Sequence, residues 1–283
     1  MVKQWLANSG LQLADHANIK AADIGRAINR ILLNNRGPRQ MQRLLLASVL
    51  RSVMLYGAPV WASAMEQPTY RRGMESTYRL TAVRVCRGFR TVSDEAALVI
   101  AGMTPIDLLA REAKFIFIRR QTVAWTQAEK SAAKAAARRA SMEEWQRRWS
   151  TSTKGRWTHR LIPNLTDWLS RQSGEVTFEL TQILSGHGCF RSYLHRFGKD
   201  SSPECTLCRN GMIEDPEHVI FSCPRFSAER LELEAILGRT PTVENLVPAM
   251  IESQEKWSAV CIYAANTMGT LRRLERLRNA GGA

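Results

Sequence analysis

The sequence lacks a secretory signal peptide and an internal repeat, and it has little of the alternating pattern typical of β-strands. Its first residues, MVKQWLANSGLQLADH, contain no uninterrupted apolar core, so they do not fit a secretory signal peptide. It has no internal repeat of solenoid period, which argues against an array fold, and it shows little strand pattern. We therefore expect a globular protein of the nucleus or the cytoplasm, not a secreted one, with one or two cores in its 283 residues.

Long hydrophobic runs are also scarce, and only residues 44–65 invite comparison with a membrane span. Arg51 near the middle would cost about 2.5–3.5 kcal/mol on insertion scales, and Pro59 would break a spanning helix. We therefore predict no membrane partner and expect instead a buried helix that ends near Gly57. The residues expected on its buried face are Leu44, Leu45, Ser48, Ser52 and Leu55.

Acidic residues are outnumbered: 26 Asp and Glu stand against 40 Lys and Arg. The formal net charge is +14 and the isoelectric point is near 10.1. Because phosphates gain most from a concentrated positive field, a nucleic acid is the expected partner, RNA, DNA or both. More than half of the positive excess lies in residues 111–160, which hold thirteen Lys or Arg and four Glu.

The centre of this basic segment, AEKSAAKAAARRASMEEWQRRW at 128–149, is rich in helix formers and poor in large aliphatic residues. We expect an exposed helix that crosses between packed regions. Trp145 and Trp149, at i and i+4, could stack on bases or dock the helix onto a neighbour, and this spacing favours docking. The residues predicted to bind nucleic acid are Arg138, Arg139, Arg147, Arg148, Lys154 and Arg156.

The rest of the chain is patterned as one helix after another. Residues 21–36 carry apolar residues at helical spacing, and RGPRQ at 36–40 breaks the pattern before the next helix, which predicts a helical hairpin. Further along, Ser93 is placed to cap a helix that Gly102 stops, and Pro105 begins another. The predicted fold class is mainly α.

Three of the six cysteines and one of the five histidines lie within CTLCRNGMIEDPEHVIFSC, residues 205–223. The pattern C-x2-C-x9-H-x4-C offers three thiolates and one imidazole from Cys205, Cys208, His218 and Cys223. Such a closed tetrahedral set suits structural Zn²⁺ and leaves no open position for catalysis. Phe221 or Phe226, beside the last ligands, could stack a base.

Two other interpretations of this cluster remain open. The cysteines could be small buried hydrophobic residues that lie together by chance. Alternatively, Cys189 and His195, just upstream, could compete as ligands. We expect the upstream segment instead to form a small core under the metal loop, made of Phe190, Tyr193, Leu194 and Phe197.

At this point the chain resembles a known family, the C-terminal region of reverse transcriptases from non-LTR, LINE-type retrotransposons of arthropods. The resemblance lies with the group that inserts into ribosomal DNA and its jockey-like relatives, and it covers residues 36 to about 240. It implies thumb-like helices, a connector, and a CCHC knuckle of Cys205, Cys208, His218 and Cys223 that helps hold template RNA or target DNA. The four segments that carry it are LLASVLRSVMLYGAPVWASAM, RTVSDEAALVIAGMTPIDLLARE, SGHGCFRSYLHRFGKDSSPECTLC and EDPEHVIFSCPRF.

The chain departs from the family at the catalytic centre. Such a polymerase holds two metal ions with paired aspartates, and this sequence contains no Asp-Asp; its acids Asp15, Asp23, Asp94 and Asp107 are scattered. The family's endonuclease is missing as well. We therefore expect a truncated copy that binds nucleic acid without catalysis. The alternatives are a part of an active RNA-directed DNA polymerase, or a domesticated zinc-binding module that interacts with proteins.

The expected organisation has four parts along the chain. A helical thumb-like region covers 1–125, in which residues 1–20 are expected to pack poorly, and a basic connecting helix and linker covers 126–175. The CCHC zinc-binding module covers 176–240, and C-terminal helices cover 241–283.

Overall fold

The computed structural model describes residues 2–34, 37–122, 125–172, 174–208 and 211–280, and in these ranges the side chains from residue 10 onward except that of Thr122. Within these residues the chain is mainly helical, as predicted, and contains no β-strand beyond an isolated antiparallel bridge between Glu204 and Ile213. The residues group into two compact units: 1–85 with 97–152, and 86–96 with 153–283. These two units are defined by how the residues pack. The four parts predicted from the sequence were defined by expected function, and they stay a prediction.

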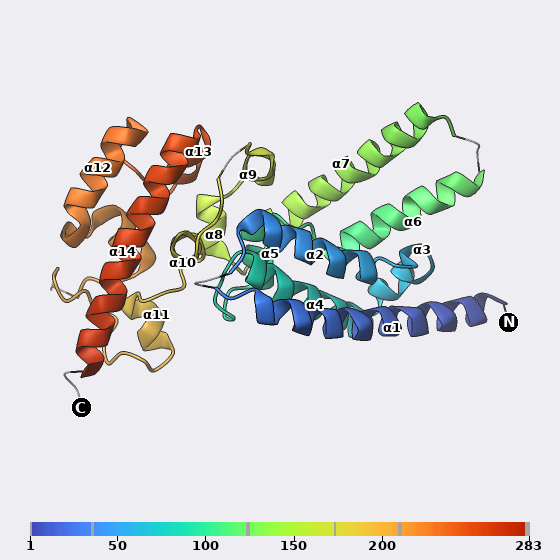
Figure 1. Ribbon diagram of the computed structural model, residues 1–283, viewed down its shortest axis with the longest axis horizontal. Helices are drawn as coiled ribbons and strands as arrows, with labels where there is room; N and C mark the ends of the chain where they lie inside the picture. Colours follow the sequence, from blue (N-terminus) through green and yellow to red (C-terminus); the bar gives the residue numbers. More distant parts are fainter. Residues whose placement is uncertain (1, 35–36, 123–124, 173, 209–210, 281–283) are drawn as a thin grey trace. The chain divides into compact units, whose positions relative to one another are not determined.

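The first unit is a set of helices built around α1. Helix α1 packs on α2, α3 and α4, helix α3 packs on α6, and α6 packs on α7. The predicted helical hairpin is confirmed as α1 and α2. The helices are α1 (Val2–Ile31), α2 (Gln40–Met54), α3 (Ala58–Trp61), α4 (Pro68–Val85), α6 (Ile106–Thr122) and α7 (Gln127–Thr151), and α5 (Asp94–Ala101) spans the division between units (Figure 1).

The N-terminal helix differs from what the sequence predicted. Residues 2–20, which we expected to pack poorly, lie in α1. Ala14 and Ala17 are buried in this helix, followed one turn later by Ala21. Small side chains at this spacing allow α1 to approach its neighbours closely, so at least the part of the segment from residue 14 contributes to the unit's packing.

A buried arginine sets the rotation of α2. The guanidinium of Arg43 is fully buried and donates from Nε to the Pro38 carbonyl (2.8 Å), from Nη1 to the Arg84 carbonyl (2.7 Å), and from Nη2 to the Leu33 carbonyl. The predicted buried face is therefore wrong, and Leu45 is 68% exposed. The buried face consists of Gln40, Arg43, Ala47, Leu50 and Met54.

Among the described residues, no single helix is both long and apolar enough to cross a bilayer. One pair of consecutive helical segments is long and apolar enough when the two are taken together, Gln40–Met54 with Ala58–Glu66. The two segments are bent by 59° relative to each other at the short break between them.

Helix α7 lies beside α6 as a hairpin (Figure 1). A capping box begins it: the Glu129 amide donates to Thr126 Oγ1 (3.3 Å), and the Thr126 amide donates to Glu129 Oε2 (2.8 Å). The helix does not cross between packed regions, because one stripe of it packs within the first unit. The stripe consists of Ala133, Ala137, Ser141, Trp145 and Trp149.

The second unit is organised around the long helix α14 (Figure 1), which packs against α10, α12 and α13. Tyr263 of α14 donates its hydroxyl to the carbonyl of Ile220 (2.7 Å), and Trp257 donates its indole N–H to the carbonyl of Glu175 (3.1 Å). The helices are α8 (Arg156–Leu161), α9 (Leu165–Ser170), α10 (Phe178–Ser185), α11 (Arg191–Arg196), α12 (Ser227–Leu237), α13 (Leu246–Ile251) and α14 (Gln254–Ala280).

Position 174 in this unit accepts only glycine without a steric clash. Gly174 has φ +98°, and a Cβ there would lie 2.2 Å from the Trp257 ring. The same ring packs on Trp168 at 5.8 Å between centroids, and the Arg171 guanidinium lies 4.1 Å over Trp168. The tight approach of the backbone to Trp257 thus holds α14 against the chain that precedes α10.

We predict that Gly174→Ala destabilises the second unit more than Gly238→Ala does. Both glycines have positive φ, but nothing lies within 4 Å of a Cβ at Gly238. The control variant therefore carries only the backbone strain of about 1–2 kcal/mol, whereas Gly174→Ala adds overpacking of about 1–3 kcal/mol. Urea unfolding followed by tryptophan fluorescence compares the two, and equal midpoints would contradict the packing argument.

Candidate metal centre

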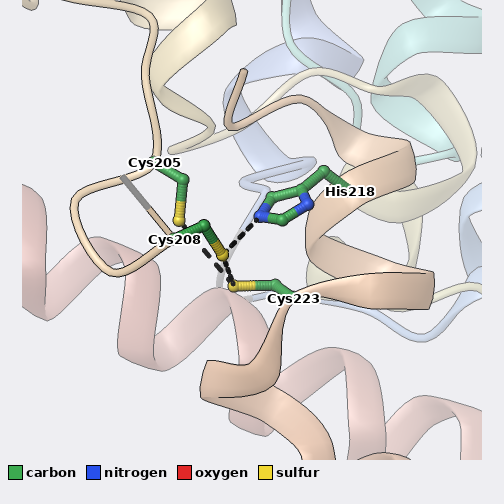
Figure 2. A group of neighbouring side chains, drawn as sticks. All are labelled: Cys205, Cys208, His218 and Cys223. Carbon is green, nitrogen blue, oxygen red and sulfur yellow. Dashed lines mark hydrogen bonds between the residues drawn. The ribbon is translucent and has the colours of Figure 1, made fainter. Parts of the chain in front are cut away.

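The structure brings the four predicted ligands close enough together to bind a metal ion. Their ligand atoms all lie within 4.8 Å of one another, and Figure 2 shows the four side chains converging. Cys223 Sγ lies 3.8 Å from Cys205 Sγ and 3.9 Å from Cys208 Sγ, and Cys208 Sγ lies 3.3 Å from His218 Nε2. A tetrahedron with metal–sulfur distances of about 2.3 Å has edges of about 3.8 Å. The two sulfur–sulfur separations match such an edge, so the four side chains lie close enough together to bind a metal ion.

A narrow loop presents the first two cysteines. The Cys205 amide donates to the Met212 carbonyl (2.7 Å), and the Glu214 amide donates to the Pro203 carbonyl (2.9 Å). These bonds flank the isolated bridge between Glu204 and Ile213. Cys205 is buried and Cys208 half-buried, so both thiols face the interior side of the loop.

A wide helical turn presents the other two ligands. Residues His218–Ser222 form a π-type turn that closes with the Cys223 amide on the His218 carbonyl (2.7 Å). Asp215 caps the turn by accepting from the His218 amide (2.8 Å). Ser222 Oγ lies 3.3 Å from His218 Nδ1, which leaves Nε2 directed at the thiols. This wide turn places the imidazole of His218 and the thiol of Cys223 on the same side.

Arginine side chains support this centre from outside. Arg225 pairs with the buried Glu214 (3.0 Å) and donates to Thr206 Oγ1 (2.7 Å). Arg230 donates to the carbonyl of Cys223 (2.5 Å). Three thiolates around a divalent ion leave a net negative charge, and nearby guanidinium groups stabilise it. No spacing in the sequence marks Arg225 or Arg230, because arginines that neutralise a ligand set from outside follow no fixed interval from the ligands.

Burial controls the protonation of the metal-free ligands. It raises the pKa of the Cys223 thiol to about 12 and raises the pKa of Cys208 above its usual value. Burial also lowers the pKa of His218, so the imidazole stays neutral at physiological pH. A metal ion must therefore displace protons from the thiols when it binds.

The competing ligands proposed from the sequence do not join the cluster. Neither Cys189 nor His195 belongs to the group of converging ligand atoms. Burial raises the pKa of the Cys189 thiol to about 12, and Glu275, its hydrogen-bond partner, acts in the same direction. Phe190 and Leu194 are buried, as expected of a small core, but Phe197 is not.

The predicted stacking residues are mostly inaccessible. Trp145 and Trp149 are 3% and 1% exposed, so docking onto the first unit, the favoured alternative, is what the structure shows. Phe226 is fully buried and cannot reach a base, whereas Phe221 is half-buried. Large aromatic side chains gain most free energy from complete burial, and the fold has used three of these four in its cores.

The predicted basic residues are divided between the two units: Lys154 and Arg156, both exposed, lie in the second, and the four arginines lie on α7. Arg147 pairs with Glu144 (2.8 Å). Arg148 pairs with Glu144 (2.7 Å) and with Asp107 (2.8 Å), a carboxylate that is almost completely buried.

Two of the four α7 arginines are thus less suited to phosphates than the sequence suggested. Arg148 balances a buried charge, so its first role is structural. Hydrogen bonds from Arg147 and from Arg148 lower the pKa of Glu144 to about 2. Arg138 lies 3.4 Å from Glu112 at the surface, and Arg139 is exposed.

Comparison with known proteins gives a consistent set of relatives. The chain is 30% identical over 254 residues to the 115 kDa protein in type-1 retrotransposable element R1DM of Drosophila melanogaster, which covers 84% of this chain and 24% of that protein. It is 34% identical over 165 residues to the Retrovirus-related Pol polyprotein from type-1 retrotransposable element R1 of Nasonia vitripennis, covering 54% and 46%. A protein of the same description from Bradysia coprophila is 27% identical over 201 residues, covering 66% and 20%.

The chain therefore spans from about a fifth to just under half of the length of these relatives. No family model matches it. No solved structure matches it.

We predict that the purified chain carries one metal ion and that Cys208→Ser loses it. Loss of the ion should loosen the loop and the turn, so hydrogen exchange should rise in residues 185–230 and stay unchanged in α1 to α4. Elemental analysis and hydrogen exchange measure the two effects. Cys189→Ser is the matched control and should keep the metal; loss of metal from this variant but not from Cys223→Ser would mean that the ligand set is wrong.

Proposed function

Because the chain is a non-LTR retrotransposon protein, homologous to the Pol polyproteins of insect R1 elements, we propose that it is a nucleic-acid-binding, non-catalytic portion of such a reverse transcriptase. The observation that carries the proposal is the convergence of Cys205, Cys208, His218 and Cys223 on one point. The resemblance stated from the sequence assigns these residues to a knuckle that helps hold RNA or DNA.

We further propose that the metal is Zn²⁺ and that its role is structural. Three sulfur ligands and one imidazole are soft donors that suit this ion. Four protein ligands fill its coordination shell, and the edges of the site fit a tetrahedron. The ion would hold the loop of Cys205 and the turn of His218 together.

Exposed basic residues, which lie on both units, supply the affinity in this proposal. Each Lys or Arg that neutralises a phosphate releases counterions, and this gain does not depend on sequence. Arg139, Lys154 and Arg156 are exposed, and none of the three pairs with a buried acid as Arg148 does. The last turns of α14 add the exposed Arg273 and Arg276. Binding should therefore be tolerant of sequence and sensitive to salt.

Two observations support the absence of nucleotidyl transfer in this chain. The sequence contains no pair of adjacent aspartates. The four acids considered as metal ligands lie on three helices, α1, α5 and α6. Of these, Asp107 is engaged by Arg148 and Asp23 by Arg26. Carboxylates neutralised by arginine are poor ligands for two Mg²⁺ ions held a few ångströms apart.

A second candidate is favoured by the length of the relatives. Two of the three relatives are named Pol polyproteins, and the chain spans 46% of one of these and 20% of the other. In that case the chain would act within a larger RNA-directed DNA polymerase whose catalytic residues lie outside it.

We predict that the chain binds single-stranded RNA with an affinity that falls steeply as the salt concentration rises. In a plot of the logarithm of the association constant against the logarithm of the salt concentration, each phosphate contact should contribute a slope of about −0.7. Replacing Arg139, Lys154 and Arg156 with Gln should flatten the slope by about 2, which is three contacts at that value. Fluorescence anisotropy at four salt concentrations measures it. A control triple variant with the same charge change, Lys20, Arg26 and Arg30 to Gln on α1, should keep the wild-type slope. Equal flattening by both triples would mean that the assigned residues are wrong.

We also predict that the purified chain extends no primer on an RNA template with Mg²⁺ or Mn²⁺. The physical reason is the lack of a carboxylate pair that could hold two metal ions. A commercial reverse transcriptase on the same template is the positive control. Incorporation that survives repurification and disappears in an Asp94→Asn or Asp15→Asn variant would establish the enzyme alternative.

A further inference from the structure

A chain of ring contacts runs through the second unit from the core to the surface. Its members, which we call the aromatic ladder, come from two stretches far apart in the sequence, the turn at residue 89 and residues 178–197. Phe178 contacts Phe89 at 5.6 Å between centroids, and Phe89 contacts Tyr193 at 6.4 Å. Tyr193 contacts both His187 and Phe197 at 4.9 Å. The aromatic ladder is Phe178, Phe89, His187, Tyr193 and Phe197.

A guanidinium group lies at each end of the aromatic ladder. Arg272 of α14 lies 5.5 Å over the ring of the buried Phe178. At the other end, Arg196 lies 5.5 Å over Tyr193 and 5.1 Å over Phe197. A guanidinium over an aromatic face is held by the ring quadrupole and keeps its own flat face available for stacking.

Hydrogen bonds hold the outer rings in place. Thr91 Oγ1 lies 2.6 Å from the Tyr193 hydroxyl and 3.0 Å from His187 Nδ1. Burial, with a smaller contribution from Arg196, lowers the pKa of His187 to about 4. At physiological pH this imidazole is therefore a neutral ring, and the outer end of the ladder is pre-organised before any ligand binds.

The outer end is accessible and positively charged. Phe197 is 46% exposed, Tyr193 and His187 are half-buried, and Arg196 and Lys199 are exposed. The acid in this stretch, Asp200, is almost buried and pairs with Arg191 (2.7 Å) and Arg278 (3.2 Å). A small hydrophobic core explains why Phe178 is buried. It does not explain why Phe197 stays exposed beneath the exposed Arg196.

We propose that Tyr193, Arg196 and Phe197 form a stacking site for the unpaired bases of a single-stranded nucleic acid. This inference rests on the proposed function, since it requires that the chain binds nucleic acid, and it adds a contact to bases where the basic residues contact phosphates. Aromatic and guanidinium faces accept any base, and Lys199 can meet the adjoining phosphate. The site is distinct from the candidate metal centre, whose own aromatic candidates are Phe226, which is buried, and Phe221, which is half-buried.

The test compares two fluorescein-labelled strands of equal charge, a 20-mer of deoxythymidine and a 20-mer of abasic spacers, bound by the full chain. Phe197→Ala should weaken binding of the thymidine strand by about 5-fold to 150-fold, the range for one lost stack, and leave binding of the abasic strand unchanged. Phe197→Trp should restore the affinity. Arg196→Lys keeps the charge and removes the flat guanidinium, so it should weaken binding of the thymidine strand alone.

Phe115→Ala is the matched control. Phe115 lies in the first unit, is 41% exposed and carries the Arg119 guanidinium 5.4 Å over its ring, so it repeats the local pair without the ladder. This variant should bind both strands as the wild type does. Metal content and circular dichroism, compared first, establish that each variant is folded.

The outcomes separate this inference from the proposed function. If Phe197→Ala and Arg196→Lys bind the thymidine strand as tightly as the wild type, or lose both strands equally, the stacking site is wrong and nucleic-acid binding stands. If Phe115→Ala has the same effect as Phe197→Ala, any exposed ring suffices and the ladder is not the site. If the wild type binds neither strand, the proposed function and this inference both fail.

Discussion

Buried backbone carbonyl groups must be hydrogen-bonded, and in this protein arginine side chains meet that need at the points where the chain changes direction. Arg43 donates to three carbonyls and joins the turn after α1 to the end of α4. Arg191 donates to the carbonyl of Glu204 (2.5 Å), and Arg230 donates to that of Cys223 (2.5 Å). A guanidinium has five N–H donors in a plane, so one side chain can satisfy several carbonyls at once. Both units depend on this use of arginine.

This constraint changes how the net charge of +14 should be understood. Part of the arginine excess is structural, because Arg43 is buried and Arg148 balances the buried Asp107. Counting basic residues along the chain overestimates the charge that a phosphate backbone could meet. The arginines and lysines that remain exposed, such as Arg139 and Arg196, are the ones that a nucleic acid can reach.

The metal centre and the aromatic ladder are mechanically connected within the second unit. The Ser192 amide at the start of α11 donates to the carbonyl of Glu214 (3.2 Å) in the metal loop. Arg191, one residue earlier, donates to the carbonyl of Glu204 on the other side of the same loop. Since α11 carries Tyr193 and the turn after it carries Phe197, a metal ion bound at the loop would order the outer end of the ladder as well.

The sequence by itself determined the helical class, the hairpin of α1 and α2, and the four residues that meet at the candidate metal centre. These properties depend on short spacings in the sequence, namely the 3.6-residue period of a helix and the intervals between the ligands. Local backbone geometry alone fixes where side chains at such spacings lie. It could not determine the buried face of α2, the burial of Phe226, or the pairing of Arg148 with Asp107, because each depends on which neighbour supplies a partner. The aromatic ladder is the clearest case. Phe89, Phe178 and Tyr193 meet only after the chain has folded, since packing forces act between surfaces and leave no periodic mark on the sequence.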